Sequence, residues 1–398
     1  MESRYDGYSR ELDKIEREGR LRHIPEEGLG HGLVDMVSND YMGMAENGSS
    51  LPLCWDGLPE ELRASYESLC GAEGEKHAEL LGKDHMWSAS ASRLLSTRQL
   101  IPDLLEKILE ADYGRPALLF NSGYHANVGC IGALNIPGTL FITDRLMHAS
   151  AYDGFAAARC RPERFPHNDI DKLQRLINRH SDEAERIVVV TESVFSMDGD
   201  RAPLKELVAL RKENDKVLLY VDEAHGYGCF GPRGLGLTME EGAADEIDIL
   251  IGTFGKAAGS AGAFAITPRP IHDMLVNGAR SFIFSTSLPP AVILRSLENH
   301  LRLRGADDRR ERLAALSTEV RKRVTELFGP TPSTTHIIPM ITGNAESAIA
   351  LAAKLRKAGI TALPIRRPTV PPGAERVRLS LSALLPREIT EKFVNLSL

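Results

Sequence analysis

Reactive side chains follow five short apolar runs of this sequence, each at the point where the run ends. These residues are Ser122, Gly123, Tyr124 and Asn127 after ALLF; Asp144 and His148 after TLFIT; Glu192, Ser196 and Asp198 after RIVVVTE; Asp222 and His225 in YVDEAHG; and Thr253 and Lys256 in GTFGKA. The carboxyl ends of parallel strands meet at one edge of an α/β sheet, and functional groups gather there. We therefore expect these side chains to lie together in one site.

Together these residues supply the groups that pyridoxal 5'-phosphate (PLP) requires. A lysine forms the imine, and a carboxylate keeps the pyridine nitrogen protonated so that the ring accepts electrons. Backbone amides at the start of a helix, with hydroxyls, hold the phosphate, and a flat side chain covers the ring face. In this sequence Lys256 is the lysine and Asp222 is the carboxylate. Ser122–Tyr124 with Thr253 would hold the phosphate, and His148 would cover the ring. The sequence predicts a PLP-dependent enzyme in which Lys256 is the imine lysine.

Each residue taken singly also has an ordinary structural interpretation. A lysine after a strand is usually a solvated side chain, an aspartate there often caps a helix, and an isolated NSG is a turn. GTFGKA is not a Walker phosphate loop, because Leu250 stands where the motif requires glycine and Ala257 follows the lysine. A Rossmann oxidoreductase is not supported, since no GxGxxG follows an early strand with an acidic residue further on.

The apolar runs also indicate the fold that positions these residues. They lie at 117–120, 139–143, 186–192, 216–223, 248–254 and 262–267, and most are rich in Val, Ile and Leu without alternation. Such runs are typical of strands buried on both faces, and helical segments such as 203–215 separate several of them. The pattern predicts an α/β fold, a mostly parallel sheet covered by helices.

The sequence changes character after STSLPP (285–290). A long charged helix is predicted over 291–327, a strand over 336–342, a helix over 345–358 and a strand over 376–383. We expect an N-terminal helix and arm over 1–45, a large PLP-binding domain over 46–290 and a smaller α+β C-terminal domain over 291–398. The N-terminal helix is expected over about 5–22.

Composition excludes several other classes of protein. The chain of 398 residues has a net charge of -7 and a pI near 6.0, so neither nucleic acid nor an anionic membrane is an expected partner. No apolar run reaches the roughly 18 residues of a membrane span, and the charged N-terminus lacks the apolar stretch of a signal peptide. Cytoplasmic localisation is expected. The five cysteines are dispersed without a CxxC pair, which argues against disulfides and against a zinc site.

Longer motifs resemble those of the α-oxoamine synthases, which are PLP enzymes of fold type I. The motifs are SNDYMGM, VTESVFSMDGD, VDEAHGYG, TFGKA, FSTSLPP and RRPTVPPGAERVRLSLSA. This family joins an amino acid to an acyl thioester, carried by coenzyme A or an acyl carrier protein, with loss of CO2. VFSMDGD, STSLPP and RPTVPPG most resemble the members that make 8-amino-7-oxononanoate for biotin from L-alanine and a pimeloyl thioester. The resemblance implies a homodimer, because Thr286 of FSTSLPP would reach the phosphate in the neighbouring subunit.

The resemblance also implies roles for the other motif residues. Lys256 is the imine lysine and the proton-transfer base, Asp222 pairs with the pyridine nitrogen, and His225 contacts the ring hydroxyl. His148 stacks on the ring. Gly123, Tyr124, Ser196 and Thr253 lie at the cofactor. On the substrate side, the resemblance implies that Arg378 binds the amino-acid carboxylate, Asn39 lines the substrate site and Arg22 helps to receive the acyl chain.

The sequence departs from the family pattern on the substrate side. SASASRLL (88–95) replaces a glycine-rich stretch, Pro102 and Leu385 stand where histidines are usual, and about 20 extra residues precede SASAS. Two alternatives therefore stay open. One is an α-oxoamine synthase that uses glycine or serine, such as a 2-amino-3-ketobutyrate ligase or a serine palmitoyltransferase. The other is a non-catalytic scaffold subunit of the same fold; such subunits lack the imine lysine, whereas Lys256 is present here.

Overall fold

The computed structural model describes residues 6–18, 33–45, 87–95 and 100–386, with the single positions 21, 60, 64 and 389. The chain divides into two compact units. The large unit comprises Asp40–Phe195 and Arg201–Glu311, and the small unit comprises Met1–Asn39, Ser196–Asp200 and Arg312–Leu398. The boundary between them falls at 311–312, whereas the sequence predicted it after 290, and the short segment 196–200 belongs to the small unit.

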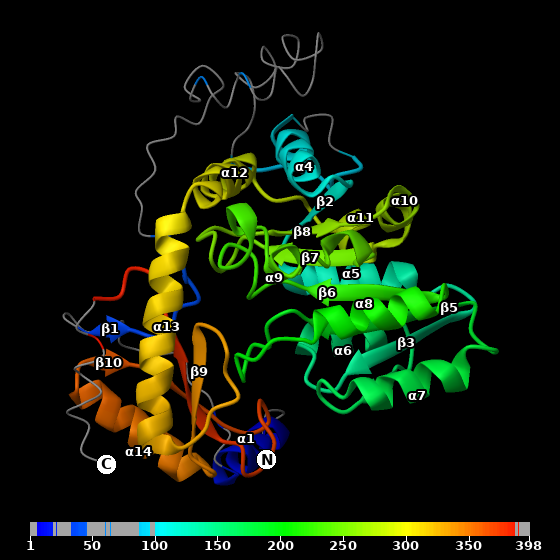
Figure 1. Cartoon of the computed structure of the whole chain (residues 1–398). Helices are drawn as coiled ribbons and strands as arrows, with labels where there is room; N and C mark the ends of the chain where they lie inside the picture. Colours follow the sequence, from blue (N-terminus) through cyan, green and yellow to red (C-terminus); the bar gives the residue numbers. More distant parts are fainter. Residues whose placement is uncertain are drawn as a thin grey trace. The chain divides into compact units, whose positions relative to one another are not determined.

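A seven-stranded sheet forms the centre of the large unit (Figure 1). Its strand order is β2-β8-β7-β6-β5-β3-β4. The strands are β2 (Ala117–Phe120), β3 (Thr139–Asp144), β4 (Glu163–Phe165), β5 (Arg186–Glu192), β6 (Val217–Asp222), β7 (Ile249–Thr253) and β8 (Ala263–Ile266). Strands β4, β3, β5, β6 and β7 are parallel, and β8 runs antiparallel to its neighbours β7 and β2. The predicted mostly parallel sheet is confirmed.

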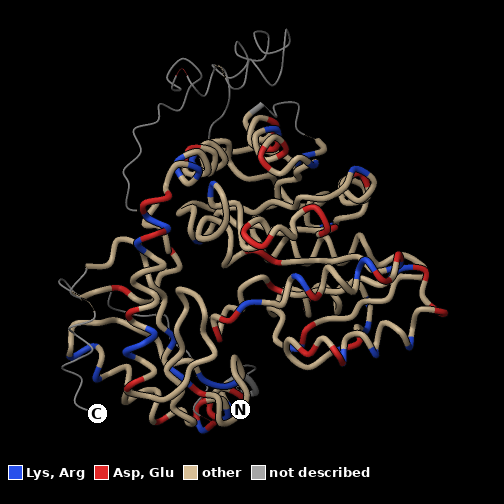
Figure 2. The backbone as a smooth tube through the Cα atoms, in the orientation of Figure 1, with Lys and Arg blue, Asp and Glu red and all other residues tan. Residues whose placement is uncertain are grey.

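Helices cover this sheet. They are α4 (Leu100–Tyr113), α5 (Gly123–Leu134), α6 (Ala149–Ala157), α7 (Ile170–His180), α8 (Leu204–Glu213), α9 (Leu237–Glu240), α10 (Arg269–Gly278), α11 (Arg280–Ile283) and α12 (Pro290–Arg304). Helix α5 packs on β2, β7 and β8 and on α6, α10 and α11, while α8 packs on β6. Figure 2 shows Lys, Arg, Asp and Glu along α7 and α8, whereas the strands are mostly uncharged.

Both faces of the central strands are buried. On β5, Val188 and Val190 belong to one core cluster with residues of α5 and α6, and Val189 between them is also buried. On β7, Ile249 and Ile251 belong to the same cluster. Successive side chains of a strand point to opposite faces, so a strand covered on both sides needs an apolar residue at every position. This burial explains the continuous apolar runs and the close agreement of their predicted bounds with the strands.

The predicted single helix over 291–327 is wrong, because two helices occupy that range. Helix α12 ends at Arg304 and α13 (Asp307–Phe328) begins three residues later. Gly305 caps α12, and its N–H donates to the carbonyl oxygens of Arg302 and Leu303. Glycine at a helix C-terminus commonly ends the helix. The charged residues around it hid this signal within a continuous helical pattern.

Most of α13 belongs to the small unit, which also contains short strands and further helices. They are α1 (Asp6–Arg17), β1 (Val34–Asp35), β9 (Ile337–Ile341), α14 (Ala345–Lys357), β10 (Ile360–Thr361), β11 (Leu363–Ile365) and β12 (Arg376–Ser380). Strand β12 lies between β11 and β9 and is antiparallel to both, while β1 pairs in parallel with β10. Strand β12 carries Arg378 in the centre of its sheet. Among the described residues, no helix is long and apolar enough to cross a membrane.

Candidate active site

The ends of β6 and β7 bring Asp222, His225 and Lys256 together. Asp222 is the last residue of β6 and pairs with Ile251 of β7. Its Oδ1 accepts a hydrogen bond from the N–H of Ala224 at 2.9 Å, which orients the carboxylate as the chain turns. His225 is buried, and its Nε2 lies 2.8 Å from Nζ of Lys256. The structure thus places an amine, an imidazole and a carboxylate at one edge of the sheet, as the sequence predicted.

Asn127 on α5 orients the Asp222 carboxylate and is itself almost fully buried. Its Nδ2 donates to Asp222 Oδ2 at 2.8 Å and to Ser150 Oγ at 2.9 Å. Its Oδ1 accepts a hydrogen bond from the Tyr220 hydroxyl at 2.7 Å. A primary amide has two N–H donors and one carbonyl acceptor, and each of these groups has a buried partner here.

His148 lies at the N-terminus of α6 and is linked to the same network. Its Nδ1 lies 2.7 Å from Ser150 Oγ and accepts from the N–H of Ser150 at 3.2 Å. Burial lowers the pKa of His148; the charge of Lys256 lowers it further, and Asp222 opposes the shift. His148 is therefore held as a neutral ring whose Nδ1 is an acceptor, which suits a flat side chain covering an aromatic cofactor.

The N-terminus of α5 lies beside the end of β7. Ser122 is the N-cap, and its Oγ accepts from the N–H of His125 at 3.2 Å. A Cβ added to Gly123 would lie 3.8 Å from Cβ of Thr253, so the start of this helix and the end of β7 are in contact. The N-terminal amides of a helix favour an anion. Tyr124 is half exposed, and its hydroxyl donates to Asp153 at 2.7 Å.

Tyr41 is a contact of this site that the sequence motifs did not identify. Its side chain is fully buried, and its hydroxyl lies 2.7 Å from Nδ1 of His225. Both ring nitrogens of His225 are therefore engaged, one by Tyr41 and the other by Lys256. The residue stands two positions after Asn39 in SNDYMGM.

Three predicted residues come together in the small unit. Arg378 on β12 donates from Nη1 to Asn39 Oδ1 at 3.2 Å and from Nε to the carbonyl oxygen of Ser196 at 2.6 Å. Its guanidinium also contacts the Ser380 hydroxyl. Arg378 is buried. The structure thus brings together Arg378 and Asn39, which were predicted for the substrate side, and Ser196, which was predicted to contact the cofactor; Arg378 and Asn39 are more than 300 positions apart in the sequence.

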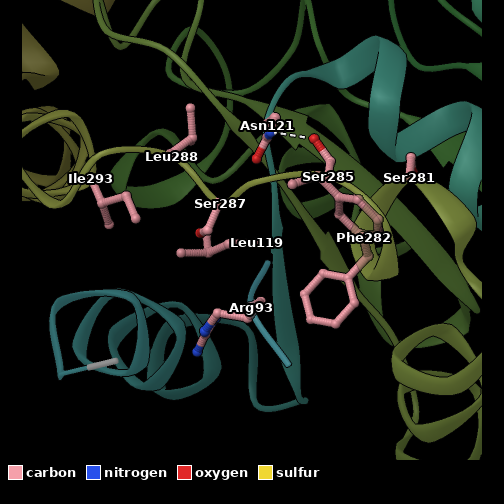
Figure 3. A pocket seen from close by; sticks show the side chains of 10 residues that line it. Arg93, Leu119, Asn121, Ser281, Phe282, Ser285, Ser287, Leu288 and Ile293 are labelled. Atoms are coloured by element: carbon pink, nitrogen blue, oxygen red, sulfur yellow. Dashed lines mark hydrogen bonds between the residues drawn. The ribbon is translucent and has the colours of Figure 1, made fainter. Parts of the chain in front are cut away.

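The segment that carries Thr286 pairs with the altered SASAS segment. Ser92 and Thr286 form an isolated antiparallel bridge, the N–H of Ser287 donates to the carbonyl oxygen of Ala91 at 3.0 Å, and Asn121 Nδ2 donates to the carbonyl oxygen of Thr286 at 2.7 Å. A pocket beside them is lined by Arg93, Leu119, Phe120, Asn121, Ser281, Phe282, Ser285, Ser287, Leu288 and Ile293 (Figure 3). Its arginine is already ion-paired with Asp103 and Glu106.

Two other departures from the family pattern have plain structural roles. Pro102 is buried in the first turn of α4, a position that suits proline. Leu385 is buried, and its carbonyl oxygen accepts from Arg312 at 2.7 Å. Neither side chain can transfer a proton. Arg22 and most of the extra segment before residue 87 lie outside the described residues.

The residues of the large-unit site fit PLP. Lys256 supplies an amine, Asp222 a buried carboxylate, His225 and His148 imidazoles, and the start of α5 supplies backbone amides. The carboxylate is held by two donors, the N–H of Ala224 and the amide of Asn127, which suits a partner for a protonated ring nitrogen. Among the described residues, no group of three or more His, Cys, Asp or Glu side chains could hold a metal ion.

Comparisons with known proteins establish the family. Residues 83–395 match the family of class I and II aminotransferases. A putative 8-amino-7-oxononanoate synthase of Pasteurella multocida is 39% identical over 397 residues, covering 97% of both chains. The 8-amino-7-oxononanoate synthase of Chlorobaculum parvum is 39% identical over 387 residues, or 94% of this chain and 93% of that one. The chain belongs to the class I and II aminotransferase family, within its α-oxoamine synthase branch.

A solved structure supports the same conclusion for the fold. A serine palmitoyltransferase (SPT) with its PLP internal aldimine is 28% identical, with a TM-score of 0.80 over 98% of this chain and 96% of that one. The predicted fold type I is confirmed, and the chain is a PLP-dependent acyltransferase.

Sequence reasoning missed the residues that orient the site. The sequence motifs assigned no role to Tyr41, Ser150 or Tyr220, although Tyr41 and Tyr220 lie within motifs and all three side chains are fully buried at their polar contacts. Asn127 did carry a usable signal. Asparagine is a weak helix former in a helix interior, and its position in α5, five residues after Ser122, indicates a role other than helix stability.

Proposed function

We propose that this protein condenses L-alanine with a pimeloyl thioester, with loss of CO2, to give 8-amino-7-oxononanoate. The observation that carries the proposal is the contact of Lys256 with His225 beside Asp222 at the ends of β6 and β7. The named relatives at 39% identity support the choice of substrates, together with the motifs VFSMDGD and RPTVPPG. Coenzyme A or an acyl carrier protein would carry the acyl group.

PLP bound at Lys256 would supply an electron sink for negative charge at the Cα of the amino acid. The amine of Lys256 would hold the cofactor and, when free, would take and return the Cα proton of the amino acid. Asp222 keeps a proton on the ring nitrogen, and Asn127 holds that carboxylate in position. His225 donates toward the ring hydroxyl, and His148 covers the ring face.

The phosphate would bind at the N-terminus of α5. Backbone amides of Gly123 and Tyr124, with the hydroxyls of Ser122 and Thr253, supply the donors. Thr286 of a second subunit would add a further hydroxyl, and Ser196 would also contact the cofactor.

The substrate side would use the small-unit residues. Arg378 would bind the amino-acid carboxylate, and Asn39, which accepts a hydrogen bond from Arg378, would keep the guanidinium in position. An arginine matches a carboxylate with paired N–H donors. Arg22 would receive the acyl chain.

We also propose that the protein is a homodimer and that it acts in the cytoplasm. Trp87, Leu95 and Phe284 are 75%, 77% and 69% exposed in the single chain. Leu95 and Phe284 flank the two segments that pair at Ser92 and Thr286. Large exposed apolar side chains on neighbouring segments indicate a surface that another chain covers. Phe284→Arg is expected to convert the dimer to a monomer in light scattering; a monomeric wild-type protein would contradict the proposal.

A panel of substrates tests the activity. L-alanine, glycine and L-serine are each combined with pimeloyl, acetyl and palmitoyl thioesters, and free thiol is measured. We expect alanine with the pimeloyl thioester to react fastest. Lys256→Ala should abolish both covalent PLP attachment, measured by mass after borohydride reduction, and thiol release. Arg378→Lys should raise the KM for alanine more than the KM for the thioester.

One observation favours a second candidate, a serine-using synthase. The SPT match covers 98% of this chain with a TM-score of 0.80. A faster reaction with serine and the palmitoyl thioester would support this candidate and overturn the alanine proposal. A protein that neither binds PLP nor releases thiol would instead support the non-catalytic scaffold.

A further inference from the structure

Tyr41 contacts His225, the histidine whose Nε2 lies beside the amine of Lys256. The Tyr41 hydroxyl lies 2.7 Å from His225 Nδ1, and His225 Nε2 lies 2.8 Å from Lys256 Nζ. We propose that Tyr41 is a positioning residue that fixes the ring orientation and the tautomer of His225. The proposal rests on the PLP-binding function proposed above and adds a residue to it.

The chemistry of the contact explains what Tyr41 does. A neutral imidazole carries one N–H, and the hydrogen bond made by one nitrogen determines whether the other is a donor. When the Tyr41 hydroxyl donates to Nδ1, the proton of His225 is on Nε2. Nε2 is the nitrogen that faces Lys256, and a ring hydroxyl oxygen of PLP held there needs a donor. With its hydroxyl as the donor, Tyr41 selects the tautomer that binds the cofactor.

The segment around Tyr41 is fixed on the turn that carries Lys256. The Asp40 carboxylate accepts from the N–H groups of Met44 and Ala45 at 2.8 and 2.9 Å. A Cβ added to Gly259 would lie 2.3 Å from the Ala45 nitrogen, so only glycine permits this approach.

An arginine also anchors this segment. Arg309 donates to the carbonyl oxygen of Met42 at 2.6 Å. The Tyr41 side chain is fully buried. The hydroxyl is therefore held at one place relative to His225, which a positioning role requires.

A second tyrosine provides a matched control within the same unit. The Tyr227 hydroxyl lies 2.7 Å from Nδ1 of His300, and His300 Nε2 lies 2.8 Å from Asp112. Tyr227 is as buried as Tyr41. Both tyrosines make the same buried bond to a histidine, but the partner of His300 is Asp112 and not Lys256. Tyr227→Phe therefore measures the structural cost of losing such a bond.

The experiment measures PLP binding to the protein freed of cofactor, and the absorbance and visible circular dichroism of bound PLP. A hydrogen bond contributes about 0.5–1.5 kcal/mol, and about 1.4 kcal/mol corresponds to a tenfold change in affinity. Tyr41→Phe is expected to weaken PLP binding by about 3- to 10-fold and to alter both spectra. Tyr227→Phe is expected to change the affinity by less than about twofold, because its histidine partner contacts Asp112 and not Lys256.

A double-mutant cycle tests whether Tyr41 acts through His225. His225→Gln keeps a polar group near the position of Nε2 but removes the imidazole nitrogen that Tyr41 contacts. In that background Tyr41→Phe should cause no further loss of PLP affinity, because interacting residues are not additive. An equal loss in both backgrounds, or equal effects of Tyr41→Phe and Tyr227→Phe, would overturn the proposal.

The outcomes separate this inference from the proposed function. Wild-type protein that does not bind PLP contradicts the function, whereas wild-type binding with an unaffected Tyr41→Phe variant contradicts only the role of Tyr41. Where Tyr41→Phe does not fold, as judged by its melting curve beside that of Tyr227→Phe, 3-fluorotyrosine at position 41 keeps the ring and makes the hydroxyl a stronger donor. It should change the spectrum of bound PLP, and an unchanged spectrum overturns the proposal.

Discussion

Replacing Asn127 with alanine is expected to damage both the stability of the large unit and the binding of PLP. The Asn127 amide is almost fully buried and makes three hydrogen bonds, to Asp222, Ser150 and Tyr220. Asn127→Ala removes these three hydrogen bonds. The buried polar groups of Asp222, Ser150 and Tyr220 then each lose one hydrogen-bond partner. The Asp222 carboxylate, which should face the PLP ring nitrogen, then keeps the hydrogen bond from the N–H of Ala224.

The size of the effect follows from these contacts. A hydrogen bond to a charged group contributes about 1.5–3 kcal/mol and a neutral one about 0.5–1.5 kcal/mol. The three bonds share one residue, so their contributions overlap and do not simply add. Alanine recovers about 0.5 kcal/mol through its higher helix propensity. We expect the free energy of unfolding to fall by about 3 kcal/mol and PLP to bind roughly tenfold more weakly.

Urea unfolding of the cofactor-free protein and PLP titration measure the two effects. Asn135→Ala is the matched control, because Asn135 caps the same helix and makes one side-chain bond, to the carbonyl oxygen of Ala158 at 3.0 Å. It is expected to cost about 1 kcal/mol without changing the affinity for PLP. If Asn127→Ala costs no more than Asn135→Ala, or if PLP affinity is unchanged, the assigned role of Asn127 is refuted.

Three further predictions concern backbone strain, pH and thiol reactivity. Ser90 has φ 54°, so Ser90→Gly should raise the free energy of urea unfolding by about 0.5–1 kcal/mol, whereas Ser90→Ala should not. Burial raises the pKa of Glu106 from 4.5 to about 7, so the folded state retains a proton that the unfolded state loses. Stability linked to Glu106 is therefore present below pH 4.5 and lost as the pH rises to about 7; an unaltered slope in Glu106→Gln would contradict this. Burial also raises the pKa of the Cys130 and Cys229 thiols, and to a lesser extent that of the less buried Cys160, so among these three described cysteines mass spectrometry should find iodoacetamide on Cys160 before Cys130 and Cys229; earlier labelling of Cys130 would contradict the structure.

The sequence alone predicted the large-unit sheet well because burial on both faces leaves a strong signal. The run ALLF coincides with β2, and RIVVVTE coincides with β5. Short edge elements were missed for the opposite reason. β4 has two exposed residues out of three, so its sequence, ERF, carries no apolar run. The break at Gly305 was missed because charged, helix-forming residues stand on both sides of it.

The cofactor residues could be predicted because each follows a strand of the same parallel sheet. The positions of Asp222, Thr253 and Lys256 follow once the ends of the strands are predicted correctly. Strands β6 and β7 end within one residue of the predicted apolar runs. Arg378 and Asn39 could not be brought together from local pattern, since their contact depends on how β12 and the first residues of the chain fold. Only the family motifs connected them.

Ser90 lies in the segment where the sequence departs from the family pattern, and its backbone conformation is one that favours glycine. The family pattern has glycines in this segment, and Ser90 retains a positive φ that favours glycine. Its N–H donates to Ser88 Oγ at 3.0 Å, and the two hydroxyls lie 3.4 Å apart. An isolated antiparallel bridge between Ser92 and Thr286 also joins this segment to the one that carries Thr286. The segment therefore has a backbone conformation that favours glycine at Ser90 while it carries hydroxyl and methyl groups, so we expect any change in substrate preference to arise from those side chains.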